Sequence, residues 1–364
     1  MKLGRRSALA IGAALVSGIA ALEGREGHCQ VRDLLTVQIG SQSGRAIVNR
    51  AQWAARREQI LKAMQRVMGP LPGAERRVPL DILVEREERT ERYVRRKLTY
   101  QSAPGERVPA WLLIPLTRKG KAPAMLVLHQ TSAEAKDEVV GPVGLANLHI
   151  GHELAELGYI VLAPDYPTLG EHKIDVYQHG WPSGSMKAIW DNMRGVDLLQ
   201  AMPEVDGKRI GVIGHSLGGH NGLFTAAFDK RLRCVVTNCG FTSFAKYYGG
   251  DLSGWAGYRY MPRIKSEFPT PEKMPFAFHD VLGAIAPRPL YVSAPLYDGN
   301  FDVSGVRDVV ASALPVYSLL GASGNLTAVY PDCGHDWPPA ERSEVYRWLN
   351  RQLRLSSDTS AAKR

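Results

Sequence analysis

From residue 124 onward, short and wholly apolar runs alternate with longer segments in which apolar residues recur at helical spacing. The apolar runs predict strands at 124–128, 159–163, 210–213, 234–237, 290–293 and 328–330. The segments between them predict helices, notably at 151–157, 187–202, 219–228, 304–320 and 340–355. Strands that are apolar throughout are typical of a parallel sheet covered by helices on both faces. Right-handed crossovers then place the C-terminal ends of these strands at one edge of the sheet.

The chain before residue 124 follows a different pattern. Residues 52–67 carry apolar positions at helical spacing and end in the glycine- and proline-rich run 68–73, so they predict a helix outside the main sheet. Extended segments at 78–84, 93–100 and 108–114 follow, and the first alternates like a half-exposed antiparallel strand. The predicted fold is α/β, with a mostly parallel central sheet, helices on both faces and an antiparallel N-terminal edge.

One connection is much longer than the others. Residues 241–286, between the fourth and fifth predicted parallel strands, are rich in aromatic side chains. These are Phe244, Tyr247, Tyr248, Trp255, Tyr258, Tyr260, Phe268, Phe276 and Phe278. A connection of this length is either a cap that lines a substrate pocket or an ordinary packed helical excursion. The pattern leaves both interpretations open.

The two ends of the chain differ in character from its centre. Arg5 and Arg6 precede an uncharged stretch over residues 7–22, which predicts an export signal of twin-arginine type with cleavage after Ala20. An uncleaved anchor is the alternative. We therefore expect a signal peptide at 1–22, a polar lead-in at 23–50, one domain at 51–355 and a polar tail at 356–364. The expected location is periplasmic or extracellular, with no membrane span after signal removal.

Composition agrees with one large globular domain, since 45% of the 364 residues are hydrophobic and 22% are charged. The net charge is +9, but the basic residues interleave with acidic and apolar positions, which indicates a solvated surface and no nucleic-acid site. Four cysteines are too few for a disulfide scaffold. Cys239 and Cys333 follow predicted strands at the same end of the sheet, so they are either a disulfide pair or free thiols. Nothing in the pattern predicts the oligomeric state.

The run from Gly214 to Gly219 lies directly between a predicted strand and a predicted helix and has Ser216 at its centre. A serine framed by glycines at a sharp strand-to-helix turn is a nucleophile elbow. The turn crowds the positions two residues before and after the serine, so Gly214 and Gly218 lie where larger side chains would collide. The N-terminus of the following helix offers free backbone N–H groups to an oxyanion.

A serine hydroxyl needs a base, and the base needs an acid that orients it. Asp298 follows the strand at 290–293, and His335 follows the strand at 328–330. The order serine, aspartate, histidine is the one that this elbow fold uses, and both loops open at the same edge of the sheet. Asp302 and Asp251 are alternative acids.

Other histidines fit different roles. His129 is expected to hydrogen-bond locally and hold the loop after the strand at 124–128. His149 and His152 have no carboxylate or cysteine partner at ligand spacing, so we expect no metal site. The serine chemistry also requires no cofactor.

These motifs resemble the α/β-hydrolase superfamily, in particular its bacterial dienelactone-hydrolase and acetyl-xylan-esterase-like branch. Further marks of the resemblance are residues 190–198 leading into 203–210, the run 286–289 and the run 333–335. The resemblance implies Ser216 as nucleophile, His335 as base and Asp298 as acid. It also implies the backbone N–H groups of Leu217 and Thr131 as oxyanion donors, with Gln130 as the alternative to Thr131. Gln130 itself departs from the family, which often has glycine at that position.

The expected function is that of an exported serine hydrolase that cleaves carboxylic esters through an acyl-enzyme. The resemblance suggests a small-molecule or carbohydrate ester as substrate, such as an acetylated polysaccharide. A peptidase or an acyltransferase would use the same three side chains with a different pocket. A binding protein that keeps the fold without catalysis is a further alternative.

Overall fold

The computed structural model describes residues 32–355, apart from residues 40, 41, 119 and 142. The predicted signal at 1–22 and tail at 356–364 lie outside the described residues. A nine-stranded sheet forms the centre, in the order β11-β10-β9-β8-β6-β7-β5-β4-β3. The strands are β3 (Leu83–Arg89), β4 (Tyr93–Ala103), β5 (Glu106–Pro115), β6 (Ala122–Leu128), β7 (Ile160–Pro164), β8 (Val205–His215), β9 (Leu232–Asn238), β10 (Leu290–Ser293) and β11 (Leu326–Val329).

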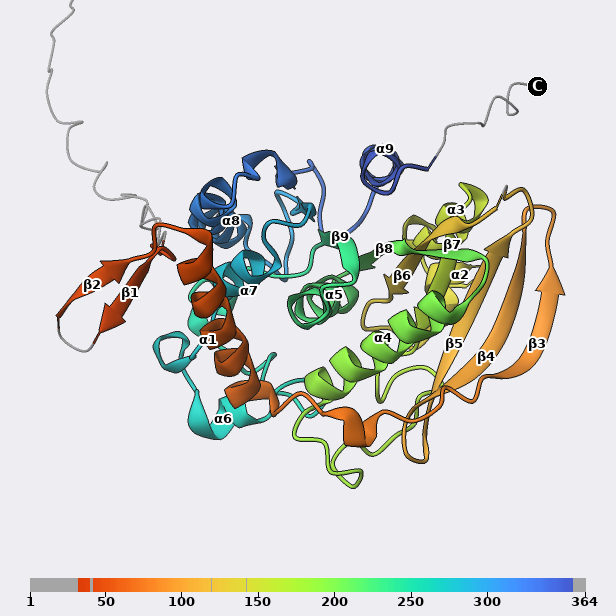
Figure 1. Cartoon of the computed structure of the whole chain (residues 1–364), viewed down its shortest axis with the longest axis horizontal. Coiled ribbons are helices and arrows are strands. Elements are labelled where there is room, and N and C mark those ends of the chain that lie inside the picture. Colours follow the sequence, from red (N-terminus) through yellow and green to blue (C-terminus); the bar gives the residue numbers. More distant parts are fainter. Residues whose placement is uncertain (1–31, 40–41, 119, 142, 356–364) are drawn as a thin grey trace, which may run out of the picture. The chain divides into compact units, whose positions relative to one another are not determined.

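The sheet is parallel from β11 to β7 and antiparallel from β7 through β5 and β4 to β3. Helices cover both of its faces (Figure 1). They are α1 (Arg50–Met68), α2 (Lys136–Val140), α3 (Ile150–Glu156), α4 (Gly184–Ala201), α5 (Leu217–Phe228), α6 (Arg263–Glu267), α7 (Phe278–Ile285), α8 (Val303–Leu319) and α9 (Pro339–Leu353). This arrangement is the α/β-hydrolase fold, as the sequence predicted.

The apolar runs form strands here because both faces of the sheet are buried. Leu126 of β6 packs into the core on the side of α4, α5, α7 and α8, whereas Val127 packs into the core on the side of α2, α3 and α9. Successive strand residues point to opposite faces, so a strand covered on both sides must be apolar at every position. Helix α1 packs against α7 and lies outside the sheet, as expected.

The N-terminal part of the chain corrects two expectations. The strand predicted at 78–84 is wrong, because β3 begins at Leu83 and its side chains are almost all exposed. The side chains of this edge strand form ion pairs with those of β4, such as Glu87 with Arg96. The strand therefore does not need the alternation of apolar residues on which the prediction depended. The polar lead-in also contains an antiparallel hairpin of β1 (Thr36–Ile39) and β2 (Gln42–Ala46).

The long connection at 241–286 contains the 3-10 turns Tyr247–Gly250 and Pro271–Lys273 together with α6 and α7. Its last part belongs to the core, because α7 packs against α1, α5 and α8. Its first part lies at the edge where the parallel strands end, beside the predicted serine.

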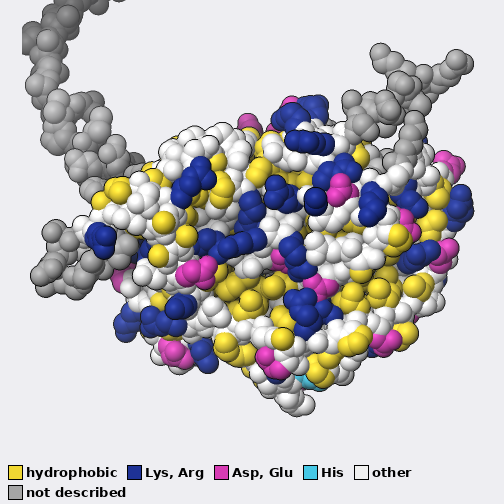
Figure 2. All heavy atoms as spheres, in the orientation of Figure 1, with side chains coloured by type: hydrophobic (Ala, Val, Ile, Leu, Met, Phe, Trp, Pro, Cys, Tyr) yellow, Lys and Arg dark blue, Asp and Glu magenta, His cyan; other side chains and the backbone are white. Residues whose placement is uncertain are grey.

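The basic side chains are spread over the viewed face of the molecule. Figure 2 shows Lys and Arg interspersed with acidic and apolar side chains on this face, without one continuous basic surface. Among the helices of residues 32–355, none has both the length and the apolar character that crossing a bilayer requires.

Candidate active site

Ser216 lies at a strained turn between β8 and α5. Its backbone angles are φ 53° and ψ −116°, a region that favours glycine, and its N–H donates to the Asn238 carbonyl at 2.9 Å. A Cβ at Gly214 would overlap the backbone of Gly218, and a Cβ at Gly218 would overlap the carbonyl of Leu128. Both glycines are therefore required for the turn that lifts Ser216 above the edge of the sheet, as the elbow predicts.

His335 and Asp298 lie on the loops after β11 and β10. His335 Nδ1 is 2.9 Å from Asp298 Oδ1, and the same oxygen accepts from the backbone N–H groups of Asn300 at 2.8 Å and Phe301 at 3.1 Å. The two loops are tied together by a bond from the N–H of Tyr297 to the Cys333 carbonyl at 3.1 Å. The carboxylate is thus held in one orientation against the imidazole.

The electrostatics of Asp298 favour its charged form. Its side chain is only 1% exposed, and burial by itself raises the pKa. The hydrogen bond and charge of His335, with the two backbone N–H groups, outweigh this effect and lower the pKa of Asp298 below its ordinary value. The acid therefore stays ionised at neutral pH, and His335 donates from Nδ1 and keeps Nε2 for another partner.

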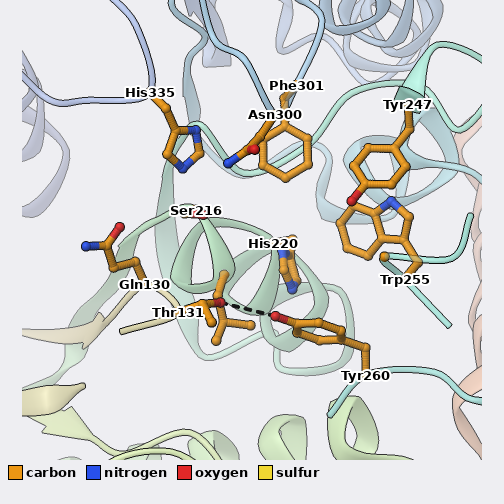
Figure 3. Close-up of a pocket in the computed structure, with 12 residues that line it drawn as sticks. Gln130, Thr131, Ser216, His220, Tyr247, Trp255, Tyr260, Asn300, Phe301 and His335 are labelled. Atoms are coloured by element: carbon orange, nitrogen blue, oxygen red, sulfur yellow. Dashed lines mark hydrogen bonds between the residues drawn. The ribbon is translucent and has the colours of Figure 1, made fainter. Parts of the chain in front are cut away.

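Ser216 and His335 line the same cavity, whose volume is about 290 Å³. Figure 3 shows the imidazole on one side of the serine and Thr131 on the other. In the described part of the chain, no hydrogen bond joins the Ser216 hydroxyl to His335. Both side chains face one cavity, and the hydrogen bonds of a catalytic serine often tighten when substrate binds.

Leu217 and Thr131 also line this cavity. Leu217 is the first residue of α5, where the backbone N–H has no helical partner. The loop before Thr131 is held by His129, whose Nε2 accepts from the Tyr166 N–H at 2.9 Å. Its Nδ1 therefore carries the proton and donates to the Gln130 carbonyl at 2.6 Å. The local role expected for His129 is confirmed. The Gln130 side chain turns to the Glu138 carboxylate at 3.0 Å.

One side of the cavity wall is aromatic, and the residues that line the cavity include no Lys, Arg, Asp or Glu. Tyr247, Trp255 and Tyr260 come from the long connection, and Phe301 comes from the loop after β10. The sequence had indicated the aromatic content of 241–286 but missed His220, which lines the cavity from α5. Its position four residues after Ser216 was the available signal, because residues at that spacing share one face of a helix.

The alternative acids lie elsewhere. Asp302 is the N-cap of α8 and accepts from the Ser304 N–H at 2.7 Å. Asp251 is exposed and accepts from the Ser253 N–H at 2.8 Å. Neither side chain hydrogen-bonds to His335.

The cysteines and the remaining histidines lie in different environments. Cys239 and Cys333 are free thiols. Ligand atoms of Cys239, Asp298 and His335 lie within 4.8 Å of one another, but burial raises the pKa of the Cys239 thiol, which disfavours the thiolate that a metal needs. His152 Nδ1 lies 2.7 Å from the phenol oxygen of Tyr93. Its Nε2 lies 3.7 Å from the Glu156 carboxylate, so the expectation that His152 has no carboxylate partner is wrong.

A serine at a strained strand-to-helix turn, beside a histidine held by a carboxylate, is the geometry of a serine hydrolase. The chain has the fold of the α/β-hydrolase superfamily. Residues 31–183 match the Abhydrolase family, and residues 149–281 match the Prolyl oligopeptidase family.

Individual relatives agree with this classification. YtaP of Bacillus subtilis (strain 168), which is named as a hydrolase, is 28% identical over 82% of this chain and 99% of its own length. Carbohydrate esterase MZ0003, from an unknown prokaryotic organism, is 26% identical over 38% of this chain, which spans 33% of that protein. A glucuronoyl esterase from Solibacter usitatus has the same fold, with a TM-score of 0.71 and 20% identity over 88% of this chain and 97% of its own.

Proposed function

We propose that this chain is a serine esterase that cleaves a carboxylic ester through an acyl-enzyme, with a carbohydrate ester as the preferred substrate. The observation that carries the proposal is the strained turn at Ser216, which shares one cavity with a His335 imidazole that Asp298 holds through Nδ1. The ester preference is supported by the esterases among the relatives, including one named for carbohydrate esters.

The proposed reaction uses each of these groups once in each half. His335 Nε2 takes the Ser216 proton while the serine oxygen bonds to the ester carbon, and the carbonyl oxygen becomes an oxyanion. The N–H groups of Leu217 and Thr131 stabilise that oxyanion. The imidazolium then protonates the leaving alcohol, which departs and leaves an acyl group on Ser216. In the second half, His335 takes a proton from water, the hydroxide attacks the acyl carbon, and Ser216 recovers its proton as the acid leaves.

The test is Ser216→Ala, with Ser343→Ala on the exposed face of α9 as the matched control. General base catalysis is worth about 10²–10⁴ in rate, so Ser216→Ala should lower turnover of p-nitrophenyl acetate by at least that factor and leave the melting temperature within a few degrees. Mass spectrometry should locate a fluorophosphonate adduct on Ser216 of the wild type. Retained turnover in Ser216→Ala would contradict the proposal, and absence of any adduct would favour a binding protein.

The match to the Prolyl oligopeptidase family supports peptide hydrolysis as a second candidate. Matched p-nitrophenyl ester and p-nitroanilide substrates with the same acyl group distinguish the two activities. Faster release from the anilide would replace the esterase proposal with the peptidase. Transfer of the acyl group to an added alcohol, in preference to water, would instead identify an acyltransferase.

Export is proposed from residues 1–22 alone, which lie outside the described part of the chain. N-terminal sequencing of the protein recovered from a periplasmic fraction should begin at residue 21, after Ala20. A protein that begins at Met1 and stays in the cytosolic fraction would contradict this proposal.

A further inference from the structure

A second histidine lines the cavity and takes no part in the proposed triad. His220 lies on α5, one helical turn beyond Ser216, with its ring on the cavity wall (Figure 3). The residue is 5% exposed. Burial lowers its pKa to about 3, which the backbone of Gly240 offsets only in part. The imidazole is therefore neutral at the pH values at which an esterase of this kind works.

Three aromatic rings lie close to the ring of His220. Its ring centroid lies 4.8 Å from that of Trp255 in an edge contact, 5.9 Å from Tyr260 and 5.7 Å from Phe224. The Nδ1 atom is buried, and among the described residues no group forms a hydrogen bond of ordinary distance and angle with it, although the Gly240 backbone is close enough to affect the pKa. Buried polar groups normally have such partners, and contacts with aromatic rings alone do not require a polar side chain. A polar ring here therefore needs an explanation other than packing.

We propose that His220 contacts substrate and selects esters that carry free hydroxyl groups near the scissile bond. This inference rests on the proposed function. Because Nδ1 has no exposed surface, a ligand in the cavity reaches the ring at its Nε2 edge.

The chemistry of the ring defines the partner. A neutral imidazole is a donor at one nitrogen and an acceptor at the other. A hydroxyl group can accept from a protonated Nε2 or donate to an unprotonated one, so it can bond to Nε2 in either tautomer. An ester group offers acceptors only, so the hydroxyl must belong to the rest of the substrate. The cavity has no charged Lys, Arg, Asp or Glu on its walls, which fits a neutral polyol. Trp255 and Tyr260, which line the cavity beside His220, are aromatic side chains of the kind against which the C–H groups of a sugar ring pack.

The experiment compares two acetates that share a six-membered ring with one ring oxygen. Methyl 2-O-acetyl-β-xylopyranoside carries hydroxyl groups, whereas tetrahydropyran-4-yl acetate has none. The wild type should have a higher kcat/KM for the xyloside. His220→Phe should lower kcat/KM for the xyloside about tenfold, the effect of one hydrogen bond, and change that for the tetrahydropyranyl ester by less than about twofold. His220→Gln, which keeps a donor and an acceptor, should recover part of the preference.

An unchanged kcat/KM for the xyloside in His220→Phe would overturn the inference. Equal losses on both acetates in His220→Phe and in His220→Gln would reduce His220 to a packing residue and overturn the inference, as would a wild type without preference for the xyloside. Thermal melts of both variants separate loss of folding from loss of selectivity. Failure of the esterase proposal itself looks different, because then neither acetate would be cleaved in a Ser216-dependent manner.

Discussion

The carboxylate of Asp298 is held in one orientation by hydrogen bonds to a single oxygen. His335 and the backbone N–H groups of Asn300 and Phe301 all bond to Oδ1, whereas Oδ2 is buried and has no hydrogen-bond partner among the described residues. The two backbone donors set the orientation of the carboxylate independently of the histidine. An amide at this position would keep the size of the side chain and lose the charge that favours an imidazolium.

We therefore expect Asp298→Asn to lower kcat for aryl acetates by about 10⁴-fold, the typical loss when a triad loses its carboxylate. Asp302→Asn is the matched control, because asparagine caps a helix as well as aspartate does and Asp302 has no bond to His335. Asp251→Asn should also retain activity. Steady-state kinetics of the three variants would contradict the assignment of the acid if Asp298→Asn were as active as the controls.

At the scale of elements, the junction between β8 and α5 depends on close backbone contact. Gly218→Ala would force its new Cβ against the Leu128 carbonyl at the end of β6. The collision involves two backbone segments that neighbouring strands hold in place, so relaxation is limited.

Gly218→Ala should lower the free energy of unfolding by about 1–3 kcal/mol or more and abolish esterase activity. Gly207→Ala, in β8, is the control, since its Cβ would meet only the flexible Gln200 side chain at 3.6 Å. Urea unfolding at constant pH measures the free energy of unfolding of both variants. Equal stability of the two variants would show that the elbow accommodates a side chain at position 218.

The long connection is tied to the loop that carries the proposed oxyanion donor. Tyr260 Oη lies 3.1 Å from Thr131 Oγ1, and the Tyr260 carbonyl accepts from the Ser185 N–H of α4 at 3.2 Å. The phenol thus joins the wall of the cavity to Thr131, while the backbone of Tyr260 is anchored separately. Removal of the hydroxyl should affect the position of Thr131 more than the position of the connection.

Tyr260→Phe should lower kcat for p-nitrophenyl acetate about threefold to tenfold, as expected for the loss of one neutral hydrogen bond that orients a donor. Its melting temperature should change by no more than a few degrees, because the ring and the backbone contacts remain. Tyr258→Phe, an exposed tyrosine outside the cavity lining, is the control. An unchanged kcat in Tyr260→Phe would show that the hydrogen bond between Tyr260 and Thr131 does not contribute to the reaction.

The sequence predicted those elements whose environment is uniform. Strands such as β10, at Leu290–Ser293, are buried at every position because helices cover both faces of the sheet, so a short apolar segment of the sequence is enough to predict them. β3 was misplaced because it is stabilised by ion pairs across an exposed edge, and such pairs depend on a partner strand that the local pattern does not contain. His220 was missed for a related reason, since its isolation becomes visible only when Trp255 and Tyr260 are brought beside it.

At the scale of the whole molecule, buried histidines make stability depend on pH. Burial lowers the pKa of His215 and of His220 to about 3, whereas an unfolded chain has the ordinary value of about 6.5. Between these values the unfolded state binds protons that the folded state does not, so stability is fully present above pH 6.5 and is lost as the pH falls. Each such histidine contributes about 1.4 kcal/mol per pH unit within this window.

From pH 6.5 to pH 5, the two histidines together should therefore lower the free energy of unfolding by up to about 4 kcal/mol. Asp298 has a lowered pKa and loses its contribution only at lower pH, when the pH falls below the ordinary value of an aspartate. Burial also lowers the pKa of His129 and His279, which add to the loss in the same window, so the contribution of one histidine is measured by comparing variants. Urea unfolding at pH 7.5, 6.5, 5.5 and 5.0 measures how steeply the free energy of unfolding changes with pH. In His220→Gln one of the two groups is gone, and the slope between pH 6.5 and 5 should fall by about 1.4 kcal/mol per unit. An identical slope in wild type and variant would mean that the imidazole at position 220 takes up a proton in the folded state, which would also remove the neutral ring on which the proposed hydroxyl contact depends.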